Sequence, residues 1–336
     1  MHLEIPALAT YPRFKLMEGP TSIQALERLQ RRLGGVNVYV KRDDVMGVGG
    51  GGNKLRKLEF LIGEAISSGA DTVITVGARQ SNHARLTAAA AARAGLACEL
   101  VLTRTVPRTS EAYVTNGNVL LDELLGAVIH DLPASEDAMS FAQHRASELE
   151  ANGHRVYICP LGGSSATGCL GYAACALEIE LQSAEMGVRF DEIVVPHGSG
   201  GTHAGLVAGY AALGRSAADV RAHTVLAQDE QARAASLEKA TAALRLLGHN
   251  AKLSADDLNI DATHLGDGYG APTDSMRDAL RLLARTEGLL LDPVYSGKAF
   301  AGLLHDIDSG RYRVGENVLF VMTGGLPGLF AYRDAF

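Results

Sequence analysis

Apolar positions along this chain follow two different spacings. In residues 36–40 every second position is apolar, which is typical of a strand with one buried face. Residues 71–76 form a short apolar run that ends at a glycine, which predicts a fully buried strand. In residues 55–65 the apolar positions lie three or four residues apart, which predicts a helix with one buried face.

The two spacings alternate over most of the chain. Strands are predicted at 36–40, 71–76, 97–102, 127–130, 156–160, 192–196 and 221–227. Helices are predicted at 55–65, 82–95, 118–125, 136–152, 171–185 and 202–213, and loops at 104–110 and 261–273. This alternation predicts an α/β fold with a largely parallel sheet. A length of 336 residues predicts about two domains, although no linker marks a boundary.

Composition and charge narrow the class of protein. The 31 basic and 38 acidic residues give a net charge of −7, which argues against a nucleic-acid partner and an anionic membrane surface. The sequence contains neither a signal peptide nor an apolar run of about 20 residues, so no membrane span is expected. The four cysteines form no C-x-x-C pair and lie in apolar stretches, which is typical of buried thiols in the cytoplasm.

A glycine run precedes the first candidate for catalysis. Five of the six residues at 47–52 are glycine, and Asn53 and Lys54 follow where a helix is predicted to begin. The helix dipole disfavours an ammonium group at this position, so it lowers the pKa of Lys54 and favours a nucleophilic amine. A solvated lysine on a flexible loop explains the same residues.

Two further segments lie between a predicted strand and a predicted helix, where backbone N–H groups bind anions. Residues 77–83 contain Ser81, whose hydroxyl and neighbouring amides suit a carboxylate, although Ser81 is equally suited to cap a helix. Residues 196–205 contain four glycines with Ser199 and Thr202, which suits a phosphate group. This loop is neither a Walker loop nor a complete G-x-G-x-x-G motif, so a nucleotide site is disfavoured.

The C-terminal third supplies polar residues at strand ends and beside glycines. Thr323 follows an apolar run, and its hydroxyl is placed to face a ring nitrogen. Tyr269 lies between two glycines and Tyr295 precedes Ser296-Gly297, which leaves both hydroxyls free to reach a site. Packed tyrosines with satisfied hydroxyls explain these two residues as well.

Together these segments supply the parts of a pyridoxal-phosphate (PLP) site: a lysine, a carboxylate site, a phosphate site and a polar strand end. The histidines and cysteines lack the spacing of a zinc site, so no metal is expected. A serine hydrolase is excluded because the chain has no G-x-S-x-G elbow. A nucleotide-binding protein that uses the Gly198 loop would form no adduct on a lysine.

At this point the chain resembles the D-cysteine desulfhydrase and 1-aminocyclopropane-1-carboxylate (ACC) deaminase family of fold-type II PLP enzymes. The resemblance covers nearly the whole chain, and these motifs carry it: Lys41-Arg42-Asp43-Asp44, Gly51-Gly52-Asn53-Lys54-Leu55-Arg56-Lys57-Leu58-Glu59, Gln80-Ser81-Asn82-His83, Thr115-Asn116-Gly117-Asn118, Asp292-Pro293-Val294-Tyr295 and Thr323-Gly324-Gly325. It implies a tryptophan-synthase-β-like α/β fold of two three-layer domains. A large PLP domain would comprise 1–50 and 165–336, a small mobile domain 51–164, and the protein would be a homodimer.

The resemblance also implies roles for single residues. Lys54 would form the Schiff base with PLP, Asn82 would bind the ring hydroxyl and Thr323 the ring nitrogen. The phosphate would be held by Asn53, Lys57, Gly198, Ser199, Gly200, Gly201 and Thr202. The substrate would meet Gln80, Ser81, Asn82, Tyr269 and Tyr295. Of these, Ser81 and the two tyrosines would act in catalysis, and one tyrosine would protonate the leaving group.

Three positions bear on the reaction. ACC deaminases carry Glu and Leu where this chain has Ser296 and Thr323, so the resemblance favours desulfhydrases and the α,β-elimination of a 3-substituted alanine. Arg79 replaces an apolar residue, and it would either bind a second anion, as in an L-cysteate sulfo-lyase, or pair with a neighbouring acid. We expect a D-cysteine desulfhydrase, with cysteate sulfo-lyase as the alternative. Less favoured alternatives are an ACC deaminase, a β-replacement synthase and a non-catalytic PLP-binding protein.

Overall fold

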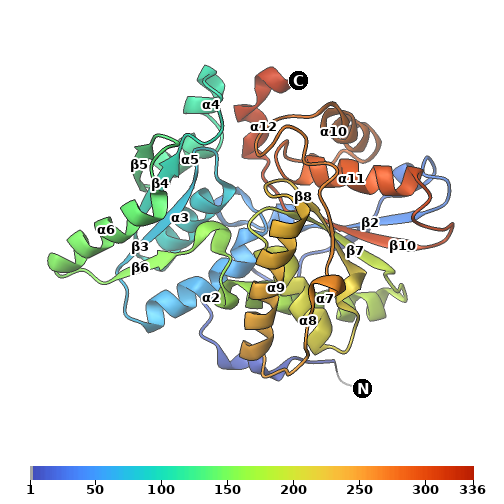
Figure 1. The fold of residues 1–336 in the computed structure, drawn as a ribbon, viewed down its shortest axis with the longest axis horizontal. Helices are drawn as coiled ribbons and strands as arrows, with labels where there is room; N and C mark the ends of the chain where they lie inside the picture. Colours follow the sequence, from blue (N-terminus) through green and yellow to red (C-terminus); the bar gives the residue numbers. More distant parts are fainter. Residues whose placement is uncertain (1–2) are drawn as a thin grey trace.

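The computed structural model describes residues 3–336, which form two β-sheets with helices on both faces (Figure 1). The larger sheet has the strand order β1 (Ile23–Ala25), β2 (Asn37–Lys41), β10 (Asn317–Val321), β7 (Glu192–His197), β8 (Val220–Thr224) and β9 (Asn259–Asp261). The smaller sheet has the order β5 (Val128–Leu132), β4 (Ala97–Thr103), β3 (Thr72–Ala78) and β6 (Val156–Cys159). The pair β1–β2 is antiparallel and all other neighbours are parallel, which confirms the predicted fold class.

Helices connect the strands within both sheets. They are α1 (Glu27–Gln30), α2 (Lys54–Ser67), α3 (Asn82–Ala94), α4 (Glu111–Thr115), α5 (Asn118–Leu124), α6 (Ala138–Ala151), α7 (Ala166–Met186), α8 (Gly201–Ala212), α9 (Asp229–Leu246), α10 (Asp274–Glu287), α11 (Ser296–Asp308) and α12 (Pro327–Ala331). The smaller sheet is built entirely from the chain between β2 and β7. In chain order, the larger sheet therefore begins with β1 and β2 and is completed by β7 to β10, after the four strands of the smaller sheet.

Neighbouring residues of the central strands enter two different cores. Val194 and Phe320 pack with α10 and α11 on one face of the larger sheet. Ile193 and Leu319, one position earlier in the same strands, pack with α7 and α8 on the other face. Because successive side chains of a strand point to opposite faces, a strand covered on both sides must be apolar at every position. This explains the unbroken apolar runs in the sequence.

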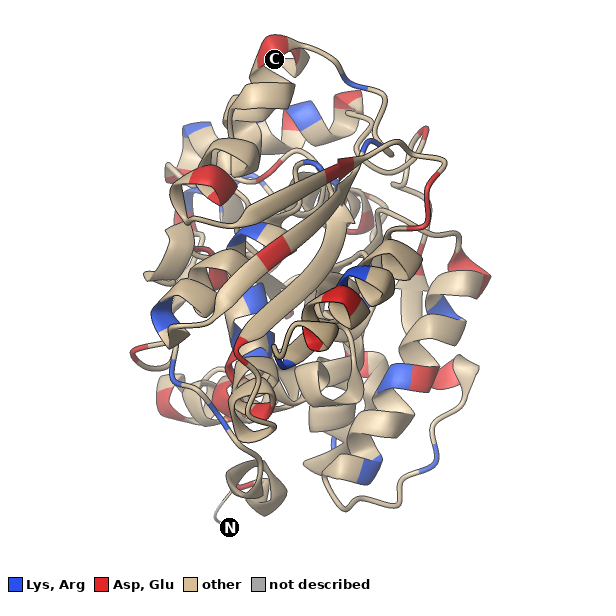
Figure 2. Ribbon diagram, turned by 90° about the vertical axis from the view of Figure 1, so that its left-hand side faces the viewer, with Lys and Arg blue, Asp and Glu red and all other residues tan. Residues whose placement is uncertain are grey.

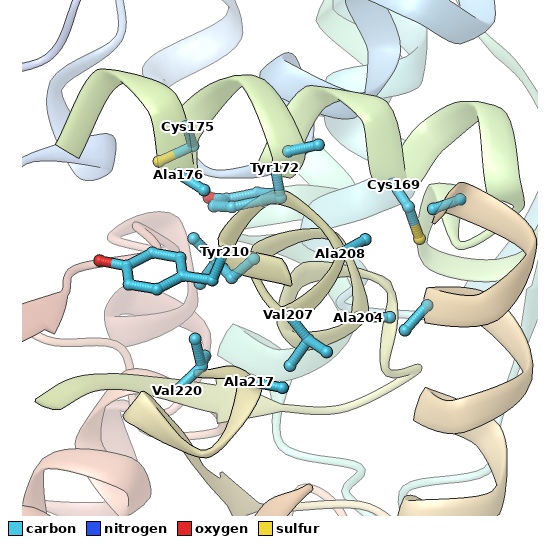
Figure 3. Close-up of a cluster of buried hydrophobic side chains, with 14 of the residues drawn as sticks. Cys169, Tyr172, Cys175, Ala176, Ala204, Val207, Ala208, Tyr210, Ala217 and Val220 are labelled. Carbon is cyan, nitrogen blue, oxygen red and sulfur yellow. The ribbon is translucent and has the colours of Figure 1, made fainter. Parts of the chain in front are cut away.

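Small residues allow α7 and α8 to pack closely against each other. Figure 3 shows Cys169, Tyr172 and Ala176 of α7 beside Ala204 and Ala208 of α8, within the core that also holds Val220. A Cβ atom on Gly205 of α8 would lie 2.4 Å from the carbonyl oxygen of Cys169. This contact seats α8, and its N-terminus, against the helix layer of the larger sheet.

The smaller sheet has separate cores on its two faces. Val73 packs with Leu55 and Leu58 of α2, whereas its neighbour Ile74 packs with Ala142 and Ala146 of α6. Each sheet therefore has its own pair of cores. The division of the chain at residues 51 and 164 remains a prediction, since these cores do not define domain limits.

Several element ends differ from the prediction because side chains cap the helices. The helix expected at 171–185 begins at Ala166, where Ser165 accepts a hydrogen bond from the Gly168 amide. The helix expected at 136–152 begins at Ala138, where the Asp137 carboxylate accepts from two backbone amides. The strand expected to end at Thr323 ends two residues earlier, at Val321. No helix was predicted after residue 227, where α9, α10, α11 and α12 lie.

Charged positions of both signs are spread over the helices and loops of the face drawn in Figure 2. Lys and Arg positions lie among Asp and Glu positions there, in keeping with the small net charge of −7. The four cysteines are buried free thiols, as the sequence indicates. No helix among residues 3–336 is long and apolar enough to span a bilayer.

Candidate active site

A cavity of about 600 Å³ lies where the carboxyl ends of strands from both sheets come together. Residues that follow β3, β4 and β6 line one side, and residues that follow β7 and β10 line the other. Ligands bind at this edge of parallel sheets because loops there can vary without disturbing the core. Of the sequence-predicted residues, these line the cavity: Asn53, Lys54, Lys57, Ser81, Asn82, Gly198, Ser199, Gly200, Gly201, Thr202, Tyr269, Tyr295 and Thr323.

Lys54 lies at the first position of α2, as predicted, and lines the cavity. Burial lowers the pKa of the Lys54 amine to about 8, although the nearby Asp292 carboxylate acts in the opposite direction. The backbone N–H of the preceding Asn53 donates to the Thr323 carbonyl oxygen at 3.0 Å. This bond joins the start of α2 to the end of β10, so Lys54 is held between the two sheets.

The N-terminus of α8 and two side chains from α2 form an anion site. Gly200 caps α8 with a φ of 86°, and a Cβ atom on Gly201 would lie 2.9 Å from the Lys57 amine nitrogen. The Asn53 amide nitrogen donates to the Thr202 hydroxyl at 3.0 Å, which ties α2 to α8. Exposed helix amides beside an ammonium group and hydroxyls match the acceptor oxygens of a phosphate. The space that only glycine leaves open is therefore chemically suited to that group.

Ser164 belongs to this anion site but was missed by the sequence reasoning. Its hydroxyl accepts from the Lys57 amine and from the Gly201 amide, both at 3.2 Å, and lies 2.7 Å from the Ser199 hydroxyl. Lys57 also donates to the Gly162 carbonyl oxygen. The signal was present in the sequence, because Gly162-Gly163-Ser164-Ser165 follows β6 as the other glycine loops follow their strands.

Ser81 and Asn82 begin α3 opposite the anion site. The Ser81 hydroxyl accepts from the Ala84 amide at 3.1 Å, and a Cβ atom on Gly77 would lie 2.6 Å from it. Ser81 is therefore a helix cap that also lines the cavity. The Asn82 side-chain oxygen accepts from the Asn118 amide at 2.9 Å, which leaves the Asn82 amide nitrogen as a donor.

Two residues predicted to meet the substrate do not line the cavity. The side-chain nitrogen of Gln80 donates to the carbonyl oxygens of Tyr113 and Asn116. Its side-chain oxygen accepts from the backbone N–H of Asn118, so Gln80 fastens the 113–118 segment. The Arg79 guanidinium lies 2.5 Å from the Asp131 carboxylate, which also pairs with Arg104. For Arg79 the structure therefore shows the second of the two expectations, pairing with an acid.

The two predicted tyrosines form a pair. Their hydroxyl oxygens lie 2.6 Å apart and their rings meet edge to face. Burial raises the pKa of both phenols, so both are protonated at neutral pH. One proton is used in the bond between the hydroxyls, and the other is available to a group in the cavity.

Asp292 organises the loop that carries Tyr295. Its buried carboxylate accepts from the backbone amides of Val294, Tyr295 and Ser296 and from the Ser296 hydroxyl. Ser296 is consequently turned away from the cavity, whereas Thr323 lines it. The motif Asp292-Pro293-Val294-Tyr295 predicted no role for Asp292, since the sequence does not show which backbone amides a carboxylate meets.

His83 is a second cavity residue that the sequence reasoning left without a role. Its Nε2 lies 2.9 Å from the Thr75 hydroxyl, and burial, reinforced by Lys54 and Lys57, lowers its pKa well below the usual value. The imidazole is therefore neutral. It lines the cavity without adding charge to it.

Known proteins match nearly the whole chain. D-cysteine desulfhydrases of Salmonella choleraesuis (strain SC-B67) and Salmonella paratyphi C (strain RKS4594) are each 44% identical over 330 residues, which is 97% of this chain and 98% of theirs. A solved ACC deaminase homologue is 40% identical and superposes with a TM-score of 0.89 over 99% of this chain and 98% of its own. An O-ureido-L-serine synthase, 19% identical with a TM-score of 0.64 over 97% of this chain and 94% of its own, shares the fold.

The family described as pyridoxal-phosphate dependent enzyme matches residues 14–324. That range includes the lysine, the anion site and both tyrosines that line the cavity. The chemistry of the donor groups and the match over the chain lead to the same cofactor. The chain therefore belongs to the family of pyridoxal-phosphate dependent enzymes.

Proposed function

We propose that the protein is a D-cysteine desulfhydrase, which converts D-cysteine and water into pyruvate, hydrogen sulfide and ammonia. The observation that carries the proposal is Lys54, an amine with a pKa lowered to about 8 in a cavity that also contains a phosphate-sized anion site. The choice of substrate is supported by the Salmonella D-cysteine desulfhydrases, which are 44% identical to this chain.

The residues of the anion site would hold the PLP phosphate. Lys57, Ser199, Thr202 and the first amides of α8 supply the donors, and Asn53 aligns Thr202. Asn82 would donate to the ring hydroxyl and Thr323 would meet the ring nitrogen. Bound PLP supplies an aldehyde that condenses with amines and a ring that stabilises negative charge on the substrate Cα.

Lys54 would move the proton that starts the elimination. At pH 7 roughly a tenth of an amine with a pKa near 8 is neutral, which is far more than for an ordinary lysine. A neutral amine accepts a proton, so Lys54 would remove it from the substrate Cα once the substrate amine has displaced it. Ser81 would orient the substrate carboxylate at the N-terminus of α3, where helix amides favour an anion.

The tyrosine pair would deliver a proton to the leaving sulfur. Because one phenol proton is used between the two hydroxyls, the other can be donated, and the pair shares the charge that donation leaves. Both phenols have a raised pKa, so they are protonated before the reaction begins. The hydroxyl separation of 2.6 Å does not distinguish which tyrosine donates.

Arg79 favours cysteine over cysteate as the substrate. A sulfonate is a permanent anion and needs a cation, but the Arg79 guanidinium is paired with Asp131 and does not line the cavity. Among the described residues that line it, the lysine or arginine side chains are Lys54 and Lys57, which we assign to the cofactor. The Asp137 carboxylate also lines the cavity, which disfavours a second anion.

Pyruvate release from D-cysteine, L-cysteine, L-cysteate and ACC tests the proposal. We expect D-cysteine to be turned over fastest, with sulfide and pyruvate in equal amounts. ACC deserves inclusion because the solved relative is an ACC deaminase homologue. Preferential turnover of ACC or L-cysteate would assign the corresponding alternative. Alanine formation with added thiols would assign a synthase, and no turnover with PLP bound would assign a binding protein.

Borohydride reduction tests the lysine separately. We expect reduction followed by peptide mass mapping to place a pyridoxyl group on Lys54. The Lys54→Ala variant should lose the adduct, and Lys252→Ala, which changes an exposed lysine, should keep it. An adduct on another lysine contradicts the site, whatever the substrate proves to be.

The organisation of the molecule is part of the proposal. We propose a small unit at 51–164 that moves relative to the remainder and so opens the cavity, supported by the cores around Ile74 and Leu100, whose residues all lie in that range. We also propose a homodimer, as the resemblance to the desulfhydrase family implies. Four free thiols support a cytoplasmic location, because that compartment keeps cysteines reduced.

A further inference from the structure

Lys298 is a buried lysine that the proposed mechanism does not use. It lies in α11, three positions after Tyr295, and its exposed fraction is 0%. Burying an ammonium group is costly unless the group is fully hydrogen-bonded, and an apolar side chain would fill the same space without that cost. The hydrogen bonds of Lys298 therefore indicate why a lysine is present at this position.

The hydrogen bonds of Lys298 go to the backbone of one loop. Its amine donates to the carbonyl oxygens of Leu265 at 2.7 Å and of Gly268 at 2.9 Å. Asp267 raises the pKa of Lys298, but burial is the larger effect and lowers it to about 8. Within residues 3–336, Lys298 forms no ion pair, so its donors serve the loop and not a carboxylate.

The loop between β9 and α10 carries Tyr269 and contains three glycines with positive φ angles. Gly266, Gly268 and Gly270 adopt φ values of 66°, 135° and 75°, so three of five consecutive residues have backbone angles that other residues avoid. Residues 262–273 contain no helix or strand. Gly268, whose carbonyl Lys298 binds, directly precedes Tyr269.

We propose that Lys298 is a positioning residue that sets the Tyr269–Tyr295 hydroxyl pair. The helix that begins immediately after Tyr295 reaches through Lys298 to the residue before Tyr269, so one rigid element holds both phenols. This inference rests on the proton-donating role proposed for the tyrosines. What it adds is a coupling between Lys298 and the tyrosine pair. Without the hydrogen bonds of Lys298, the 2.6 Å contact between the two hydroxyls is lost.

Hydrogen–deuterium exchange of the holoenzyme tests the fastening of the loop. In Lys298→Met, which shortens the side chain by one atom and removes its donors, we expect amides of residues 265–270 to exchange at least tenfold faster. Other peptides should be unchanged. Asp267→Asn is the matched control, because it removes the nearby charge and leaves both hydrogen bonds. Unchanged protection of the loop in Lys298→Met would overturn the proposal.

A double-mutant cycle then tests whether Lys298 acts through Tyr269. We expect Lys298→Met to lower kcat at least tenfold, with PLP absorbance and KM little changed. In a Tyr269→Phe background the same substitution should cost less than twofold, because the hydroxyl it positions is already absent. Equal losses in both backgrounds would show that Lys298 acts elsewhere and would overturn the coupling.

The two readouts separate this inference from the proposed function. Full activity of Tyr269→Phe would refute the catalytic role of Tyr269, and the exchange experiment would still decide the fastening. Should Lys298→Met fail to fold, Lys298→Gln retains a donor amide on a shorter side chain. We expect it to give intermediate exchange and kcat. Wild-type exchange of the loop together with wild-type kcat in Lys298→Gln would overturn the proposal.

Discussion

The chemistry of the site depends on a few ionisable groups whose surroundings change their protonation. Burial lowers the pKa of Lys54 and of His83, and raises the pKa of the phenols of Tyr269 and Tyr295. Desolvation disfavours the charged form of every one of these groups. At neutral pH the cavity therefore offers a basic amine and two protonated phenols, which is the protonation state that an elimination requires.

The lowered pKa of Lys54 predicts a fast reaction of the apoprotein with acylating reagents. At pH 7 roughly a tenth of an amine with a pKa near 8 is neutral, against less than about 0.1% for an ordinary lysine. We expect labelling of Lys54 to exceed that of the exposed Lys252 by about 100-fold at pH 7, measured by peptide mass mapping.

The pH dependence of that labelling has a definite sign. The Lys54 rate should rise about tenfold per pH unit up to about pH 8 and then level off, whereas the rate for a short lysine peptide should keep rising towards pH 10. Parallel profiles for Lys54 and the peptide would show that Lys54 has an ordinary pKa.

At the scale of elements, the site is built where helices begin. Lys54, Ser81 and Gly201 are at or beside the first residues of α2, α3 and α8, and each of these helices follows or faces the carboxyl end of a strand. The unpaired amides of a helix N-terminus favour anions. Two of these helices thus provide places for a carboxylate and a phosphate before any charged side chain is counted.

Gly201→Ala should weaken the binding of PLP without unfolding the protein. The added Cβ atom would lie 2.5 Å from the Ser164 hydroxyl and 2.9 Å from the Lys57 amine, so it displaces both groups from the anion site. We expect the dissociation constant, measured by absorbance titration of the apoprotein, to rise at least tenfold. Gly19→Ala, where the added atom meets nothing within 4 Å, is the control. Equal affinities would show that this loop does not hold the phosphate.

A buried ion pair joins α2 to the turn at Asp43–Val45, after β2, and to α7. The Asp43 carboxylate accepts two hydrogen bonds from Arg56 at 2.8 Å and one from the Tyr172 hydroxyl at 2.6 Å. Without Asp43 the buried Arg56 keeps only Glu178 as an acidic partner, so Asp43→Ala should lower the free energy of unfolding by about 3 kcal/mol in urea titrations.

Asp44→Ala is the matched control for Asp43. Asp44 pairs with Arg42 in a more exposed setting, where its side chain is 15% exposed against 0% for Asp43. Its loss should cost roughly 1 kcal/mol or less, because solvent screens the remaining charge. Similar costs for the two substitutions would contradict the role assigned to burial.

At the scale of the whole molecule, the cavity lies between two sheets that have separate cores. The chain passes from the larger sheet to the smaller between β2 and β3 and returns between β6 and β7. Hydrogen bonds of Asn53 with Thr323 and Thr202 connect the two sheets beside the cavity. A cofactor bound there contacts residues of both sheets. Its binding energy therefore adds to the stability of the assembled molecule.

Removal of PLP should accordingly lower the midpoint of thermal unfolding. A ligand at 100 times its dissociation constant stabilises the folded state by about 2.7 kcal/mol. We expect the wild-type protein to show this loss on resolution of the cofactor, followed by scanning calorimetry. Lys54→Ala should show a smaller difference between its two forms, because it cannot form the covalent bond. A wild-type midpoint that ignores PLP would contradict the site.

The spacing of apolar residues determined the class of fold and most elements up to residue 227. Buried parallel strands and amphipathic helices produce patterns that persist in the sequence, and the strand at 71–76 was found for that reason. Helix ends were less predictable, because Asp137 and Ser165 became caps only through hydrogen bonds that the sequence does not display.

The sequence by itself also indicated Lys54 and the loops at 77–83 and 196–205, because backbone N–H groups between a strand and a helix favour anions. Only the tertiary structure decided the partners. It paired Arg79 with Asp131, placed Ser164 beside Lys57 and joined Lys298 to the Tyr269 loop. The two residues of each contact are separated by between 33 and 107 positions along the chain. No local pattern specifies which distant group a side chain will meet.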